Sequence, residues 1–468
     1  MYRIVRQHLV RQHLVRRQIV RRIGAATLVG AAALAAAAGC GSVLEVDNPN
    51  NVNAESLDDP ASARAQVNGA LASLTRAAAM LLGPIETASD DMSWSGSLDG
   101  MQRFDRGFLQ DPYNEFLEAS YAFMTPARFM ANRTIKQLEE FQRDGRPFDQ
   151  TQLAVANLYA AITYDYIANH HDDFVIASNE REAGGAIGPA NMVSLYDSVE
   201  AAAVRGLAIS GTTPAQRGAL TAMRARGKSD RAIWRKLNPS GTAAVAQPLV
   251  DDQAAADDAV AALALLGSDS RFQLVVQNGM AAGAGNCFFP NCTNARQEIR
   301  FDPAIATYVY TTSTLTVALR DPITDQADPR IAPLITEFVA PSGGTNLIPI
   351  TVTGSRDMLL IIAEVALARG DVATFQARIN QLRALNALPA WTGAAGQPAA
   401  VDMLLHERRA NLFLQGRRLH DMYRFGIVDP RWAPDSDART CPGSLLPINN
   451  AERLANPNVS AWQPGCGQ

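Results

Sequence analysis

The most regular pattern of apolar and polar positions in the chain begins at residue 358. Four apolar residues recur there at i, i+3, i+4 and i+7, the spacing of one helical face: Met358, Ile361, Ile362 and Val365. This helix is expected to end at Gly370, and Asp371 is a residue type that caps the start of a helix. A second run with helical spacing follows, at Val372, Phe375, Ile379 and Leu382. The pattern therefore predicts two amphipathic helices joined by a tight Gly-Asp turn.

Other stretches show helical spacing more loosely. Helices are expected at residues 62–82, 113–141, 150–169, 191–207 and 243–266, with a kink or break at Pro126. Residues 298–319 alternate Tyr, Val, Thr and Leu and are expected to form short strands or extended segments, whereas the rest of 211–295 shows no clear pattern. Helical hairpins must stack on neighbours to bury their apolar faces, as in tetratricopeptide-like arrays. The predicted fold is therefore mainly α-helical, although the chain has no clean 34-residue repeat.

The first 39 residues have the order of a secretory signal. A basic stretch with seven arginines and no acidic residue is followed by an apolar run from Ile23 to Ala38 and then by Gly39 and Cys40. As a helix this run would cover about 24 Å, short of the roughly 30 Å hydrocarbon core, so removal as a signal peptide is favoured over a transmembrane anchor. Without this leader the formal net charge falls from −4 to −11. Such an acidic body lacks the clustered Lys and Arg that nucleic-acid binding requires.

Cys40 stands where a bacterial lipoprotein carries its acylated cysteine. Residues 37–40 resemble a lipobox, with Ala37 in place of the usual leucine. The alternative is ordinary signal cleavage near Ala38, which would leave Cys40 as a free thiol. We expect residues 1–39 to be a lipoprotein signal peptide, residues 40–60 a lipid anchor with a polar tether, and residues 61–468 one helical domain.

The other four cysteines fit an exported, oxidising setting. Cys287 and Cys292 flank a short loop, and Cys441 and Cys466 bracket the C-terminal tail. An even count in a secreted chain favours disulfides. A zinc site is the alternative, but the sequence lacks paired C-x-x-C units with nearby histidines. We therefore predict no metal and no other cofactor.

One acidic cluster is a candidate for binding or catalysis. Glu86, Asp90 and Asp91 precede Trp94 in a loop rich in serine and glycine. Paired carboxylates could hydrolyse a glycosidic bond, or they could bind sugar hydroxyls while Trp94 stacks on an apolar sugar face. A structural polar loop with one partly buried tryptophan is the third interpretation. The sequence has no serine-nucleophile elbow, no phosphate-binding loop and no complete zinc-peptidase motif.

Several motifs follow one another in the C-terminal part of the chain. Residues 407–422 read ERRANLFLQGRRLHDM, preceded by LIIAEVALARGD at 360–371 and by Asp-Pro-Arg at 328–330. Leu-Pro-Ile at 446–448 and Asn-Pro-Asn at 456–458 follow. In this order the motifs resemble those of the RagB/SusD family of outer-membrane nutrient-binding lipoproteins, whose segment E-R-R-x-E-L-x-x-E-G-x-R-x-x-D-L has acids where this chain has Asn411 and Gln415.

The resemblance implies one domain of tetratricopeptide-like hairpins that covers a SusC-like TonB-dependent outer-membrane transporter. It implies capture of a glycan or, in some members, a peptide, by a protein that is not an enzyme. By position, the family's ligand loop after the first helix corresponds to Glu86, Asp90, Asp91 and Trp94, with Arg103 as a further candidate. Two other functions stay open: a surface glycoside hydrolase that uses Asp90 or Asp91, and a helical-repeat scaffold with protein partners only.

Overall fold

The computed structural model describes residues 54–177, 183–241, 245–277, 298–339, 347–462 and 466. The chain divides into two compact units, residues 1–57 and 58–468. The short helix α2 (Ala54–Leu57) is the described part of the first unit. The predicted signal peptide, Cys40, and the cysteine pair at 287 and 292 lie outside the described residues.

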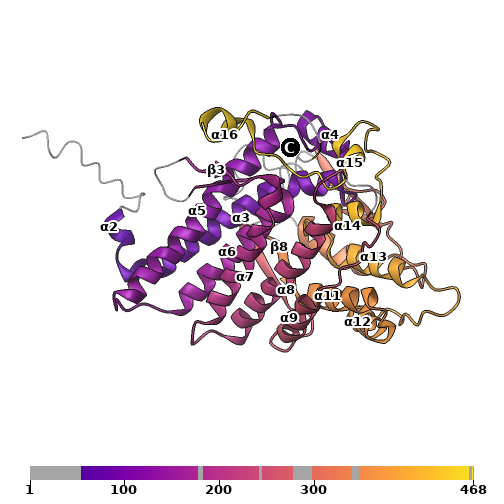
Figure 1. Cartoon of the computed structure of the whole chain (residues 1–468). Coiled ribbons are helices and arrows are strands. Elements are labelled where there is room, and N and C mark those ends of the chain that lie inside the picture. The colour runs from indigo at the N-terminus through magenta and orange to yellow at the C-terminus, as the bar shows by residue number, and fades with distance from the viewer. Residues whose placement is uncertain are drawn as a thin grey trace, which may run out of the picture. The chain divides into compact units, whose positions relative to one another are not determined.

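The second unit is mainly α-helical, as the sequence predicts (Figure 1). Its longer helices are α3 (Ala63–Ala88), α5 (Glu115–Arg143), α6 (Thr151–His170), α7 (Ser194–Leu207), α8 (Pro214–Leu237), α9 (Gln253–Leu263), α10 (Ile331–Val339), α11 (Ser355–Ala368), α12 (Val372–Ala384), α13 (Ala400–Asn411) and α14 (Arg418–Phe425). The shorter ones are α4 (Asp99–Asp105), α15 (Asp437–Thr440) and α16 (Asn450–Ala455). No helix in the described part of the chain is long and apolar enough to span a bilayer.

Strands in the described residues pair two by two, each pair antiparallel. β1 (Met92–Trp94) pairs with β5 (Ile299–Phe301), and β2 (Val175–Ile176) pairs with β3 (Gly185–Ala186). β4 (Arg271–Gln277) pairs with β8 (Leu347–Gly354), and β6 (Ala306–Val309) pairs with β7 (Thr314–Val317). The extended segments expected within residues 298–319 are therefore confirmed as β5, β6 and β7.

The long helices form consecutive pairs: α3 with α5, α6 with α7, α8 with α9, and α11 with α12. Each pair packs on the next, so that the pairs lie side by side in Figure 1. This stacking buries the apolar face of each helix against a neighbour, and the predicted tetratricopeptide-like hairpins are confirmed. At the turn between α11 and α12, Gly370 has a φ of 74°, and the Asp371 carboxylate accepts a hydrogen bond from the Thr374 N–H at 3.0 Å.

Two helices were not predicted, and a third passes through the site of the expected kink or break. α5 continues through Pro126, which excludes a break there; although a proline removes one helical hydrogen bond, the apolar face of α5 stays packed on α3. α10, which contains Pro333, was not among the predicted helices. α8 was not predicted at all, because Arg226, Asp230 and several small residues interrupt the large apolar side chains of its buried face.

The motif at residues 407–422 and Arg424, two residues after it, contain several buried charged side chains. Arg424 and Arg408 are buried, and both contact the carboxylate of Glu364 on α11. Asp421 completes this cluster, 2.8 Å from each of the two arginines. Burial alone would raise the pKa of Glu364, but the charges of Arg424 and Arg408 outweigh burial and hold that pKa below its ordinary value.

Two further clusters connect this segment to other helices. Arg417 contacts Asp230 on α8 at 2.5 Å, and Arg226 lies 2.9 Å from Asp165 on α6. The carboxylate of Glu407 contacts Arg330, which precedes α10, and Arg383 on α12. In the cluster around Glu407, Asp321 and Asp328 neutralise the remaining positive charge: Asp321 is 2.7 Å from Arg383 and Asp328 is 2.6 Å from Arg330. The charges of this segment are therefore paired inside the protein, and the pairing reaches across the helical array.

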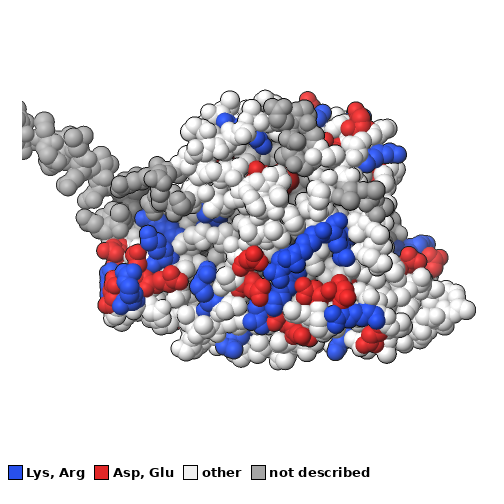
Figure 2. All heavy atoms as spheres, in the orientation of Figure 1, with Lys and Arg blue, Asp and Glu red and all other residues white. Residues whose placement is uncertain are grey.

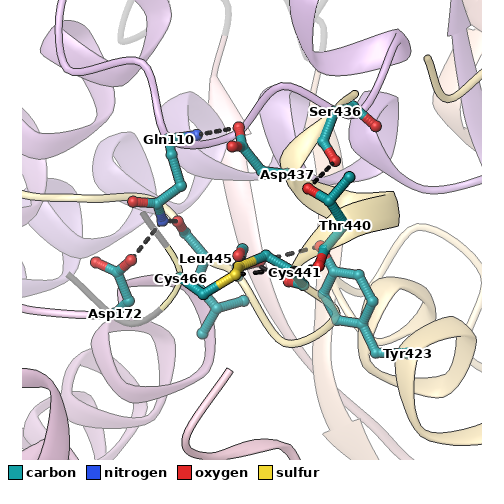
Figure 3. Close-up of a disulfide and its surroundings, with 10 residues drawn as sticks. Gln110, Asp172, Tyr423, Ser436, Asp437, Thr440, Cys441, Leu445 and Cys466 are labelled. Atoms are coloured by element: carbon teal, nitrogen blue, oxygen red, sulfur yellow. Dashed lines mark hydrogen bonds between the residues drawn. A yellow bond between two sulfur atoms is a disulfide. The ribbon is translucent and has the colours of Figure 1, made fainter. Parts of the chain in front are cut away.

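The C-terminal tail is fastened by a disulfide between Cys441 and Cys466 (Figure 3). Beside it, the backbone N–H of Gln110 donates to the Asp437 carboxylate at 2.9 Å, and the Gln110 side chain donates to the carbonyl of Leu445. The tail is thus held against the segment between α4 and α5 by covalent and polar contacts.

Replacing Glu364 by glutamine tests the buried cluster. The variant leaves Arg408 and Arg424 buried with one carboxylate fewer, and removing one partner of such a cluster costs about 3–5 kcal/mol. We expect a clear fall in the urea midpoint of unfolding. Asp144→Asn, which breaks the exposed pair with Arg143, is the control and should leave the midpoint unchanged. Equal midpoints for the two variants would contradict the assignment.

Candidate ligand-binding site

Two of the predicted ligand residues, Glu86 and Asp91, lie inside the protein. Glu86 belongs to the last turn of α3, and its carboxylate accepts a hydrogen bond from the Gly416 N–H at 2.7 Å. Asp91 accepts one from the Leu414 N–H at 3.4 Å. Both carboxylates are buried. They hold the turn between α13 and α14, where Leu414 and Gly416 have positive φ, and a surface ligand does not reach them.

The two carboxylates influence each other's ionisation. Burial and then the charge of Asp91 raise the pKa of Glu86 well above its ordinary value. Burial and then the charge of Asp90 raise the pKa of Asp91 to about 7. The charges of Arg409 and Arg418 oppose the rise at Asp91 but do not cancel it.

Asp90 is also committed to contacts within the protein. Its carboxylate lies 2.5 Å from the Arg418 guanidinium and 2.9 Å from that of Arg409. Burial alone would raise its pKa, but the hydrogen bond from Arg418 and the charge of Arg409 lower that pKa overall. Asp90 is therefore ionised and paired with arginines. It has no proton to donate, so it is unsuitable as a general acid.

Trp94 and Arg103 lie in different surroundings. Trp94 ends β1, opposite Ile299 of β5, and its backbone N–H donates to Asp105 at 3.1 Å. Arg103 on α4 is half exposed, 3.0 Å from Asp111, with its guanidinium 4.6 Å from the centre of the Phe108 ring. The five predicted ligand residues therefore do not form one surface. Of the predicted loop, Ser95 and Gly96, directly after Trp94, line a pocket.

That pocket has a volume of about 440 Å³, within the usual size range of ligand sites. It lies where the β1–β5 ladder meets the β6–β7 hairpin. Its lining residues are Ser95, Gly96, Arg300, Phe301, Pro303, Ala306, Thr307, Tyr308 and Tyr310.

Aromatic rings form one side of the pocket. Tyr308 lies on β6, and Tyr310 is the first residue after the end of that strand. Because the two tyrosines are two positions apart, their side chains lie on the same face. Their ring centres are 4.7 Å apart in an edge-to-face arrangement. Burial raises the pKa of Tyr310, and its hydroxyl has no hydrogen-bond partner among the described residues. Tyrosine rings of this kind offer a stacking surface beside a polar group.

Contacts from elsewhere in the chain hold the other side of the pocket. The carboxylate of Glu298 accepts hydrogen bonds from the Ser97 hydroxyl at 3.0 Å and from the Leu98 N–H at 3.1 Å. A Cβ at position 96 would come within 2.6 Å of the Glu298 backbone, so Gly96 permits this close approach. Arg431 lies 3.0 Å from Asp302 and donates to the Met92 carbonyl at 3.2 Å, which ties β1 to the turn after β5.

The sequence prediction missed Arg300, Tyr308 and Tyr310. The alternating tyrosines at 308 and 310 were visible in the sequence, but they were interpreted only as a strand signal. Their place in a pocket depends on the packing of β5 against β6, which the sequence pattern does not reveal.

A metal site is disfavoured by the charges around the one candidate found in the described residues. Asp321, Asp328 and His406 bring ligand atoms within 4.8 Å of one another. Arg383 and Arg330 already bind the two carboxylates, and their positive charges oppose a cation at this position.

Asp91→Asn tests the raised pKa. An unfolded aspartate has a pKa of about 3.9, so the raised folded pKa stabilises the protein at low pH. That stability is lost as pH rises toward 7. We expect the melting temperature of the variant, relative to the native protein, to increase between pH 4 and about 7 and then to level off. Asp402→Asn, at an exposed position, is the control. A difference that does not change with pH would exclude ionisation of Asp91 in this range.

Comparison with known proteins gives matches in both sequence and structure. The SusD family model matches residues 356–459. A SusD superfamily protein from Bacteroides fragilis is 14% identical, with a TM-score of 0.58 over 86% of this chain and 99% of its own. A SusD-like carbohydrate binding protein from Bacteroides vulgatus is 12% identical, with a TM-score of 0.58 over 86% and 97%. A laminarin binding SusD-like protein is 16% identical, with a TM-score of 0.51 over 85% and 98%.

Among curated proteins, none matches the chain. At identities this low, the structural likeness is evidence of a shared fold. The sequence match covers the helical hairpin of α11 and α12 and the charged segment that follows it. Residues 356–459 thus match the SusD family model, and the chain as a whole shares the fold of SusD superfamily structures.

Proposed function

We propose that this chain captures a glycan at the cell surface and passes it to a SusC-like TonB-dependent transporter, without acting as an enzyme. In this proposal, lipid on Cys40 anchors the protein in the outer membrane. The pocket between the β1–β5 ladder and the β6–β7 hairpin takes a sugar, and a peptide is the alternative ligand.

The observation that carries the proposal is the pair of tyrosine rings on one side of the pocket. Sugar rings have apolar faces that stack on aromatic side chains, and Tyr308 and Tyr310 supply such a surface beside the hydroxyls of Ser95 and Thr307. The likeness in fold to the carbohydrate-binding and laminarin-binding proteins supports the same ligand class. A site that binds with modest affinity suits transfer to a transporter, because weak complexes dissociate quickly.

The alternative of a glycoside hydrolase is less favoured by the contacts of its candidate acids. Such an enzyme needs one carboxylic acid and one carboxylate that both reach the scissile bond. Asp90 is held by two arginines, and Asp91 is buried. Neither lines the pocket.

A thermal-shift screen of the mature domain against oligosaccharides and peptides tests the proposal as a whole. Stabilisation by an oligosaccharide without release of product is the expected outcome. Product release would favour the hydrolase, and no response to any ligand would favour a scaffold with protein partners only.

Tyr308→Ala tests the pocket directly. Loss of a stacking ring at the centre of a site typically costs more than about 1 kcal/mol, so the dissociation constant of the oligosaccharide that binds best should rise about fivefold or more. Isothermal titration measures this change. Tyr113→Ala is the control, because Tyr113 is 69% exposed and does not line the pocket. Equal affinities for the two variants would place the ligand elsewhere.

Cys40→Ala tests the anchor. Without an acylated cysteine, the protein should move from the membrane fraction to the soluble fraction of cells, since lipid chains supply the membrane affinity. Mass spectrometry of the native protein should find Cys40 acylated. An unmodified Cys40, with the native protein free in the periplasm, would contradict the lipoprotein assignment.

A further inference from the structure

Arg300 on β5 lines the pocket together with its neighbour Phe301. Ile299 and Phe301 are buried and Arg300 is exposed, as expected where side chains alternate along a strand. Its Nε donates to the Ser93 hydroxyl at 3.3 Å, across the β1–β5 ladder. Among the residues that the structure describes, this is the one hydrogen bond of the guanidinium; it orients the group and leaves its terminal nitrogens available.

The acids that flank Arg300 are engaged elsewhere. Glu298 is buried and binds the backbone and hydroxyl of the loop after β1. Asp302 is buried, lies 3.0 Å from Arg431 and accepts a hydrogen bond from the Ala304 N–H at 2.7 Å. Among the residues that the structure describes, no carboxylate forms an ion pair with Arg300, and no acid lines the pocket.

This situation differs from that of other arginines in the protein. On the face shown in Figure 2, basic side chains over the helices have acidic side chains beside them. Ion pairs between helices include Arg224 with Asp258, 2.5 Å apart, and Arg231 with Asp197, 2.8 Å apart. Arg300 gives the pocket a positive charge that the lining residues do not neutralise.

We propose that this pocket selects sugars that carry an anionic group, a carboxylate or a sulfate ester. The inference rests on the proposed function and assigns its ligand class. The planar guanidinium of Arg300 can donate two parallel hydrogen bonds to such a group, while the sugar ring stacks on Tyr308 and Tyr310. A neutral sugar keeps the stacking contacts and loses the charge-assisted ones.

The test compares ligands that differ in charge. Isothermal titration measures the binding of oligogalacturonides, their fully methyl-esterified forms, sulfated carrageenan oligosaccharides and neutral laminari-oligosaccharides. We expect one of the two anionic ligands to bind about fivefold or more tightly than the neutral ones. Arg300→Gln should remove that preference, because glutamine offers no charge to the anionic group. Raising the salt concentration should weaken anionic binding to the native protein more than to this variant.

Control variants distinguish the possible outcomes. Arg320→Gln removes an exposed arginine that pairs with Asp325 and does not line the pocket, so it should keep the preference. Arg300→Lys retains the positive charge but lacks the planar guanidinium that donates two parallel hydrogen bonds, so this variant should keep part of the preference for anionic ligands. Neutral sugars that bind as tightly as anionic ones, or an Arg300→Gln variant that keeps the preference, would overturn this inference while leaving glycan capture intact. No binding by any of these oligosaccharides, charged or neutral, would overturn glycan capture itself.

Discussion

Charges that leave water on folding must be matched inside the protein, and this requirement joins distant parts of the chain. Arg408, Arg417 and Arg424 reach carboxylates on α8 and α11, while Glu407 binds cations before α10 and on α12. Leaving one such charge unmatched costs several kcal/mol, so arrangements that separate the partners are strongly disfavoured. The helices are amphipathic and could stack in more than one way; the buried charges favour the arrangement in which all of them are paired.

The same requirement explains why the loop after α3 is rigid enough to border a pocket. Asp90 is paired with Arg409 and Arg418, and Glu86 accepts a hydrogen bond from the backbone of the turn between α13 and α14. Arg431 then ties β1 to the turn after β5. The acids predicted as ligand contacts therefore pair within the protein and do not line the pocket. They position Ser95 and Gly96, which line it.

The sequence predicted the fold better than the site, for a physical reason. The hairpin of α11 and α12 is encoded locally, by apolar spacing and by the Gly370–Asp371 turn. By contrast, the surroundings of Glu86 depend on Gly416, 330 positions away in the chain. No local pattern reveals such a partner, so an acid-rich loop looks exposed when it is buried. α8 was missed because its buried face carries Arg226 and Asp230, whose charges are compensated only in the folded protein.

Arg300, Thr307 and Tyr308 belong to short two-stranded ladders, apart from the helical pairs. The ion-pair clusters that join the helices include none of these three side chains. Recognition and architecture are therefore separable in this molecule. New side chains at these positions could retarget the protein to another sugar at little expense to folding, which makes the site a suitable starting point for directed evolution.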